Sequence, residues 1–166
     1  YIDFVYTLPA DDYMVGMSIQ PHNMQLALAQ NMSSIELQWN QTIPQQEKGR
    51  KFEEKYAQLQ YMFVGGDIEK LSEVKADRAK ESARLKWIAY KDQFFSTVLI
   101  ADDAFESTQM ESTPLNALSR YIKEYNTTTS LPLDITGKKT TDLHYYLGPN
   151  HYNTLKAYDK DVEKAD

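Results

Sequence analysis

The sequence predicts a mainly β protein, an antiparallel β-sandwich of about eight or nine strands with one C-terminal helix. Apolar and polar residues alternate along many short runs, and residues 34–40 are the clearest example. Clusters of Gly, Pro, Asn and Asp separate these runs at short intervals, which is typical of antiparallel sheets. The 12 Tyr, 6 Phe and 2 Trp suit pleated, half-buried surfaces.

The N-terminal part predicts three strands. Residues 1–8 and 13–19 flank a turn-forming segment, Pro9-Ala10-Asp11-Asp12, so the two runs predict a hairpin. Residues 20–32 are polar and irregular. Residues 34–40 predict a half-buried antiparallel strand, because their apolar members share one face: Ile35, Leu37 and Trp39.

The next segments are more polar. Residues 45–51 read as a charged surface loop, and residues 56–64 as a strand that ends at Gly65-Gly66. Residues 67–74 can add a short strand. Residues 75–84 contain helix-forming residues but almost no apolar face, and an isolated polar helix is marginal. We therefore expect a mobile loop or a single helical turn there.

Residues 86–100, KWIAYKDQFFSTVLI, form the most apolar and most aromatic stretch of the chain. The run is too short to span a membrane, which takes about 20 apolar residues, and it is charged at its centre. We read it as one central strand with Trp87, Phe94 and Phe95 in the core. Either a bulge lies near Gln93 or the two phenylalanines occupy opposite, covered faces. A role as the wall of a binding site is the alternative.

The C-terminal third predicts a loop, two strands and a helix. Asp102-Asp103 begins the loop, and Thr113-Pro114 has the pattern of a helix start, with Leu115, Leu118 and Ile122 on one side. A strand from about residue 120 to 135 follows this short helical turn. Residues 141–147 predict the last strand.

Gly148-Pro149-Asn150 breaks the last strand and leads into the terminal helix. Asn150 can cap a helix over residues 150–160, since Asn is a preferred residue at a helix start. The spacing of three apolar residues predicts that they share one face of this helix: Tyr152, Leu155 and Tyr158.

Composition excludes several classes of protein. The net charge is −6, from 18 basic and 24 acidic residues spread through the chain, which argues against nucleic-acid binding and against docking on anionic lipid. Cysteine is absent, so disulfides and thiolate metal sites are excluded. The 166 residues suit a single domain. The chain opens on a strand pattern without Met and closes on charged residues 159–164, so we expect a part of a longer protein.

Motifs of catalysis are missing from the sequence. His22, His144 and His151 lack the spacing of a zinc site, although the last two flank the Gly148-Pro149 turn and could approach each other. No nucleophile elbow, phosphate-binding loop or dinucleotide fingerprint occurs. Three carboxylate pairs are read as solvated turns: Asp11-Asp12, Glu53-Glu54 and Asp102-Asp103. The residues therefore predict no catalytic site, no metal and no cofactor.

Two blocks of sequence resemble a known family. Residues 87–97, WIAYKDQFFST, are similar to the W-x-A/G-x-x-x-Q-Y/F-F signature of the periplasmic domain of YidC-type membrane protein insertases. Residues 143–155, LHYYLGPNHYNTL, resemble the last strand, the Gly-Pro turn and the following helix of that domain. The resemblance covers roughly residues 45–160, whereas residues 1–44 fit it only loosely. The family-signature residues on these blocks are Trp87, Gln93, Phe94, Phe95, Gly148 and Pro149.

The resemblance implies a fold and a role. The family domain is a β-supersandwich related in shape to galactose-mutarotase-like proteins, and this chain would be its C-terminal part, with sheet edges left open by the missing half. It implies a non-enzymatic scaffold at the periplasmic face of the bacterial inner membrane, which supports insertion and folding of membrane proteins with the Sec machinery. The implied partners are the membrane domain of the same polypeptide, Sec translocon subunits and nascent membrane proteins. The candidate interaction residues are on the helix leading toward the membrane: Tyr152, Leu155 and Tyr158.

Two other functions fit a tyrosine-rich β-sandwich. A carbohydrate-binding or mutarotase-like protein would need a concave cleft with aromatic platforms beside histidine and carboxylate side chains. An adhesion or assembly domain of the cell envelope is supported only by the β character of the chain.

Overall fold

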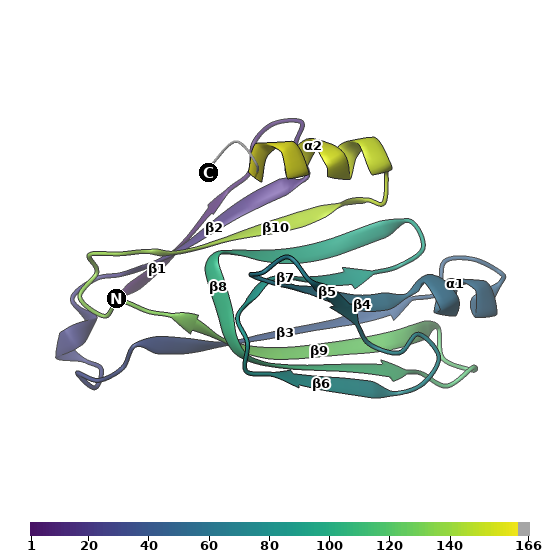
Figure 1. Cartoon of the computed structure of the whole chain (residues 1–166), viewed down its shortest axis with the longest axis horizontal. Helices are drawn as coiled ribbons and strands as arrows, with labels where there is room; N and C mark the ends of the chain where they lie inside the picture. Colours follow the sequence, from purple (N-terminus) through teal and green to yellow (C-terminus); the bar gives the residue numbers. More distant parts are fainter. Residues whose placement is uncertain (163–166) are drawn as a thin grey trace.

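The computed structural model describes residues 1–162, so the last two residues of the charged segment 159–164 lie outside it. The described residues form ten strands, two α-helices and one short 3-10 helix (Figure 1). Two sheet layers pack face to face around one apolar core. The predicted antiparallel sandwich with a C-terminal helix is confirmed, with ten strands instead of eight or nine.

The upper layer in Figure 1 contains seven strands in the order β1-β2-β10-β8-β7-β4-β5. All neighbouring strands in it are antiparallel. The hairpin predicted at the N-terminus is confirmed as β1 paired with β2. The strands are β1 (Ile2–Thr7), β2 (Met14–Pro21), β4 (Gln58–Phe63), β5 (Ile68–Lys70), β7 (Leu85–Lys91), β8 (Phe95–Pro114) and β10 (Thr141–Pro149).

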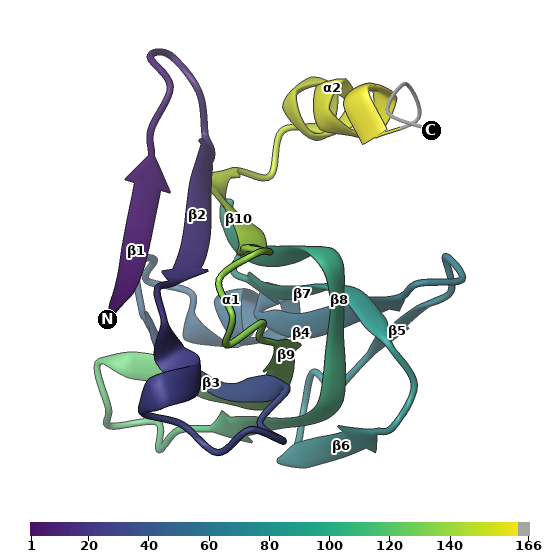
Figure 2. The same ribbon diagram turned by 90° about the vertical axis from the view of Figure 1, so that its left-hand side faces the viewer.

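The lower layer is built on the second half of β8. β9 (Tyr121–Pro132) pairs with β8 and with β3 (Ser34–Pro44), while β6 (Asp77–Glu81) pairs with the other edge of β8. Figure 2 shows β8 turning a corner, so that one strand belongs to both layers. The prediction that Ile35, Leu37 and Trp39 face inward from β3 is confirmed, because all three pack against the core.

The corner in β8 corrects the loop predicted at Asp102-Asp103. The backbone continues as one strand of 20 residues through this pair. The pairing of β8 with β9 shifts between Glu106 and Gln109, and Ser107 has a φ of 49°. A bulge adds local twist and lets one strand pass from one sheet to the other, which a pattern of polar residues cannot distinguish from a loop.

Residues 86–100 do not form one strand, because a tight turn divides them into β7 and β8. The Asp92 carboxylate accepts hydrogen bonds from the backbone N–H of Phe94 (2.8 Å) and Phe95 (2.6 Å). An Asp side chain that binds backbone N–H groups two and three residues further on stabilises a turn, because those groups then do not pair with a neighbouring strand. Phe94 and Phe95 are 45% and 51% exposed, so their prediction as core residues is wrong.

Trp87 also lies outside the core. It is half-buried and pairs across the sheet with Met62 and Ile100, which are half-buried as well. The opposite face of β7 carries the buried residues Ile88 and Tyr90. Aromatic content located the strand correctly but did not show which face points inward.

Two further predictions between residues 75 and 120 are wrong. The polar segment 75–84 contains the strand β6. This strand is held by backbone hydrogen bonds to β8, which the polar side chains of the segment do not reveal. Thr113-Pro114 ends β8 and starts no helical turn. A hairpin loop follows, in which the Leu115 N–H donates to the Ile122 carbonyl and Leu118 is 96% exposed.

Two short helices lie in the first third of the chain. A 3-10 helix, η1 (Met24–Leu26), falls in the segment expected to be irregular. The predicted loop at residues 45–51 continues from Gly49 into a helix that was not predicted, although the residues from Phe52 onward are good helix formers: α1 (Arg50–Tyr56). The terminal helix predicted at residues 150–160 is present as α2 (Tyr152–Val162).

The core is aliphatic with aromatic residues at its centre. Trp39 and Tyr90 stack with ring centroids 3.8 Å apart, and Tyr125 lies 4.9 Å from Tyr90. The Tyr90 hydroxyl lies 2.6 Å from Thr127 Oγ1 and 2.9 Å from the Trp39 carbonyl oxygen. The largest fully buried side chains include Tyr90, Tyr125, Tyr146, Phe105, Ile43, Leu59, Leu85, Ile88, Leu99, Met110 and Ile122.

Candidate interaction site

The two blocks that carry the family resemblance meet at Asn150. Its side-chain amide donates to the carbonyl oxygens of Asp92 (3.0 Å) and Phe95 (3.3 Å), and its Oδ1 accepts from the Ser96 hydroxyl. Its backbone N–H donates to the Phe94 carbonyl at 2.7 Å. The predicted helix cap is thus used as an anchor, which fixes the chain between β10 and α2 to the β7–β8 turn.

Gly148 has a packing reason to be glycine. It is buried in β10, and a Cβ there would lie 2.7 Å from Cζ and from the hydroxyl oxygen of Tyr146 and 2.9 Å from Cγ of Tyr13. Real side chains do not approach so closely, so the two rings require glycine beneath them. The Tyr146 hydroxyl donates to the carbonyl of Pro149, the last residue of β10, at 2.7 Å.

The terminal helix is docked through Tyr158. Its hydroxyl donates to the Asp12 carboxylate and accepts from the Tyr13 backbone N–H at 3.3 Å. Its ring meets the Tyr146 ring edge-on with centroids 5.4 Å apart, and the ring centroids of Tyr13 and Tyr146 lie 6.1 Å apart. We call Asp12, Tyr13, Tyr146 and Tyr158 the tyrosine latch.

The hydrogen bond between Tyr158 and Asp12 in the tyrosine latch shifts the pKa values of both residues. The hydrogen bond from Tyr158 lowers the pKa of Asp12, and the Met14 N–H contributes in the same direction. Partial burial raises the pKa of Tyr158, as does its bond to Asp12. Both shifts favour a neutral phenol donating to an ionised carboxylate, which is the stronger form of this hydrogen bond.

The three residues predicted on one face of the helix separate in the structure. Tyr158 packs on the sandwich, whereas Tyr152 is 70% exposed and Leu155 is 38% exposed. Each residue turns an α-helix by about 100°, so positions six apart lie about 120° apart around the axis. Tyr152 therefore points away from the docked residue, while Leu155 lies between the two, about 60° from each, and is partly exposed beside Tyr152.

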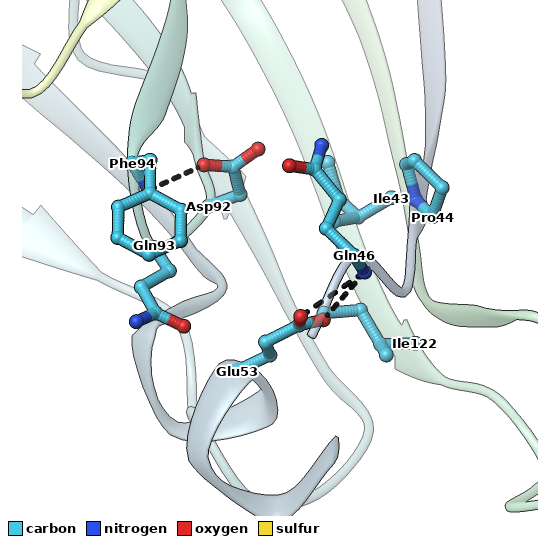
Figure 3. A pocket seen from close by; sticks show the side chains of 8 residues that line it. All are labelled: Ile43, Pro44, Gln46, Glu53, Asp92, Gln93, Phe94 and Ile122. Atoms are coloured by element: carbon cyan, nitrogen blue, oxygen red, sulfur yellow. Dashed lines mark hydrogen bonds between the residues drawn. The ribbon is translucent and has the colours of Figure 1, made fainter. Parts of the chain in front are cut away.

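Gln93 lines a small cavity at the base of the β7–β8 turn (Figure 3). The cavity has a volume of about 10 Å³, and Gln93 Oε1 is buried there without a hydrogen-bond partner among the described residues. Such a volume holds about one water molecule and no larger ligand. The lining residues come from four separate segments: Ile43, Pro44, Gln46, Glu53, Asp92, Gln93, Phe94 and Ile122.

A larger groove of about 290 Å³ lies beside the corner of β8. Four carboxylates line it, and the Asp102 carboxylate is 2.8 Å from Nδ1 of His144. Its apolar lining comes from Ala101, Ala104, Leu131, Pro132, Leu133 and Leu143, and none of the lining residues within residues 1–162 is aromatic. The aromatic platform that the carbohydrate hypothesis requires is therefore missing from this groove.

The histidines do not gather. His144 Nδ1 lies 2.8 Å from the Asp102 carboxylate, whereas His151 Nδ1 lies 3.2 Å from Thr154 Oγ1. The two histidines on either side of the Gly-Pro turn therefore have different hydrogen-bond partners. The described part of the chain contains no group of three or more His, Asp or Glu residues arranged to hold a metal ion.

Two buried charged residues were missed by sequence reasoning. Glu53 was read as solvated, but it is 3% exposed and accepts hydrogen bonds from the backbone N–H groups of Gln46 and Glu47. Lys123 is 1% exposed and donates to three backbone carbonyls. The alternation of Tyr121, Lys123 and Tyr125 could have predicted the burial of Lys123, because it places the lysine on the same face of the strand as the fully buried Tyr125.

No helix within residues 1–162 has the length and apolar character needed to cross a bilayer. A sequence profile of the YidC periplasmic domain matches residues 1–165, so the similarity includes residues 1–44, which resembled the family only loosely. Membrane protein insertase YidC of Azobacteroides pseudotrichonymphae is 51% identical over 96% of this chain, and that of Parabacteroides distasonis is 46% identical over 98%.

The Bacteroides fragilis insertase YidC is 43% identical over 99% of the chain. In each case the chain spans about a quarter of the relative: 26%, 25% and 26% of its length. The match of the profile covers both signature blocks and the strands on either side of them. The chain belongs to the family of YidC periplasmic domains, which lie on the periplasmic side of the inner membrane.

Proposed function

We propose that this chain is a non-enzymatic interaction domain of a membrane protein insertase. In this role it supports insertion and folding of membrane proteins together with the Sec machinery. The observation that carries the proposal is α2, whose start is anchored by Asn150 and whose outward side presents Tyr152 and Leu155. This helix is the proposed contact with the membrane domain of the same polypeptide, with Sec subunits or with nascent chains.

The use of the charged side chains supports a structural role. Asp12 receives Tyr158, Asp92 forms the β7–β8 turn, and Glu53 binds backbone N–H groups. Catalytic carboxylates are expected to converge on a pocket large enough for a substrate. Glu53 and Asp92 do not line such a pocket, because their cavity has room for about one water molecule. The support concerns these two carboxylates and Asp12, and not the four aspartates of the groove beside the corner of β8.

Site-specific photo-crosslinking in the full-length insertase tests the proposal. Probes replace Tyr152 and Leu155 on α2, and a control probe replaces Leu118, which is 96% exposed in the β8–β9 loop on the opposite layer (Figure 1). Tyr13 is unsuitable as a control because it contacts Tyr158. Crosslinks from the α2 probes to Sec subunits, nascent chains or the membrane domain are expected. Equal yields from Leu118, or none from α2, would contradict the proposal.

A further inference from the structure

We propose that α2 is a two-position element, docked on the sandwich by the tyrosine latch and released when Tyr158 leaves Asp12 and Tyr146. In the released position, Asn150 still holds the start of the helix at the β7–β8 turn. The use of such a device in partner contact rests on the proposed function. The two positions themselves follow from the contacts of α2 and are tested separately.

The described hydrogen bonds and aromatic contacts between residues 152–158 of α2 and the sandwich converge on one side chain. Within residues 152–158, every described hydrogen bond or aromatic contact that reaches a strand or a strand connection involves Tyr158. Tyr152 interacts with Lys156 of the same helix, and the Leu155 N–H with the His151 carbonyl. Figure 2 shows α2 standing off the sheet layers.

A single docked side chain holds a short helix weakly. An isolated helix of 11 residues is marginal in water, so α2 depends on its docking for order. The latch is also partly exposed to solvent, where hydrogen bonds and aromatic pairs stabilise least. Contacts of this size leave a minor conformer populated at roughly 0.1–10%.

The pivot of the proposed movement lies at His151, and the surface on which Tyr158 docks, which we call the seat, is the ring of Tyr146. A single residue, His151, separates the anchored Asn150 from the first helical residue, so the helix can swing there without disturbing β10. Release uncovers the ring of Tyr146, which stays in place because its hydroxyl is bonded to Pro149 and it packs over Gly148. The seat therefore has the same form in both positions, and Tyr158 can leave it and return to it reversibly.

Spin-label distance measurements test the two positions. The chain contains no cysteine, so labels can be placed on Asn153→Cys in α2 and on Gln109→Cys in the lower layer, both exposed. Tyr158→Phe removes only the hydroxyl, and Tyr158→Ala removes the ring as well. Tyr152→Phe is the matched control, because this tyrosine lies on the same helix and makes no described contact with the sandwich.

We expect one dominant distance in the unmodified chain and a second population that grows at least about fivefold in Tyr158→Phe, because the hydroxyl's bonds to Asp12 and to the Tyr13 N–H are both lost. In Tyr158→Ala the second population should dominate, while Tyr152→Phe matches the unmodified chain. An unchanged thermal unfolding midpoint in all variants shows that the sandwich is intact. A Tyr158→Ala distribution equal to the unmodified one, or an equal change in Tyr152→Phe, would overturn the proposal whatever the crosslinking shows.

Discussion

The two α-helices of this domain differ in how they are attached. α1 has 7 residues, and Arg50 at its start donates to the carbonyls of Ser119 (2.7 Å), Leu115 (2.9 Å) and Tyr121 (3.1 Å). α2 has 11 residues, and within residues 152–158 its described hydrogen bonds and aromatic contacts with the sandwich all involve Tyr158. The shorter helix is the more firmly held. Attachment is therefore set by side-chain hydrogen bonds to backbone groups and not by helix length.

Lys123 completes the attachment of α1. Its amine carries three protons and donates to the carbonyls of Glu73 (2.8 Å), Glu54 (3.3 Å) and Ala57. Two of these carbonyls are at the C-terminal end of α1, where the helix dipole favours a cation. Burial lowers the pKa of Lys123, while Glu73 and Glu54 oppose that shift. We call α1, Lys123 and the adjoining part of β9 the buried junction.

The largest expected effect is loss of the fold at high pH, starting from the core beside the buried junction. Burial raises the pKa of Tyr90 and of Tyr125 above its usual value near 10. A raised pKa means that the stabilisation is complete below pH 10 and is lost as the pH rises above it. Each of these tyrosines should remove about 1.4 kcal/mol per pH unit.

Tyrosinate absorbance and circular dichroism, recorded together from pH 8 to 12, check this expectation. The buried tyrosines should ionise only in a cooperative step that coincides with unfolding. Ionisation of all tyrosines near pH 10 with the sheet signal intact would contradict the assigned burial. The lowered pKa of Lys123 acts in the opposite sense, adding stability as the pH rises toward 10, so the loss should begin above that value.

Lys123→Met should lower the free energy of unfolding by about 3 kcal/mol or more. Methionine fills a similar volume, but the buried Ala57 carbonyl and the half-buried Glu54 and Glu73 carbonyls lose their donor, and each unsatisfied group carries a cost. Urea denaturation measures the difference. Lys156→Met is the matched control on exposed α2 and should change the free energy by less than about 0.5 kcal/mol. Equal effects in the two variants would remove the distinction between the helices.

Gly148→Ala should cost about 1–3 kcal/mol, because the added methyl forces the rings of Tyr13 and Tyr146 to move. It should also release α2, since one of these rings, that of Tyr146, is its seat. Gly65→Ala is the control, because nothing lies within 4 Å of a Cβ at that position. Thermal unfolding and the spin-label distance together report both effects. A variant as stable as the control, with α2 still docked, would show that the close approach is unimportant.

Two conservative changes in the core sharpen the role of buried hydroxyls. Tyr90→Phe should cost about 1–1.5 kcal/mol, because the Trp39 carbonyl and Thr127 lose a partner. Tyr125→Phe should be neutral or slightly stabilising, since the Tyr125 hydroxyl has no hydrogen-bond partner among the described residues. Chemical denaturation of both variants under the same conditions decides the order. The reverse order would mean that the hydroxyl bonds are misassigned.

Local patterns predicted those features that depend on neighbours in sequence. Alternation located β3, the β1–β2 hairpin and β10, and helical spacing located α2. The corner in β8 and the edge strand β6 depend on pairing with distant strands, so composition alone suggested loops. Phe94 and Phe95 were misplaced because the turn formed by Asp92 ends β7 before them.

The candidate site was predicted in part. Spacing identified Tyr152, Leu155 and Tyr158 on the terminal helix, but it did not separate the docked tyrosine from the two exposed residues. The family signature marked Gly148 and Gln93 without a reason. The packing of two rings over Gly148 supplies one for the glycine. Gln93 lines the small cavity, and its buried Oε1 has no hydrogen-bond partner among the described residues. The structure therefore gives no packing reason for a glutamine at this position.

Hydrogen exchange in two settings tests the central claim that α1 is fixed and that α2 is the element that meets the membrane domain. In the isolated chain, amides of α1 should exchange only with global unfolding, and amides of α2 much faster. In the full-length insertase in lipid nanodiscs, α2 should become protected over Tyr152–Leu155 while α1 is unchanged. Exchange of α2 that is equally fast in both settings would contradict the claim.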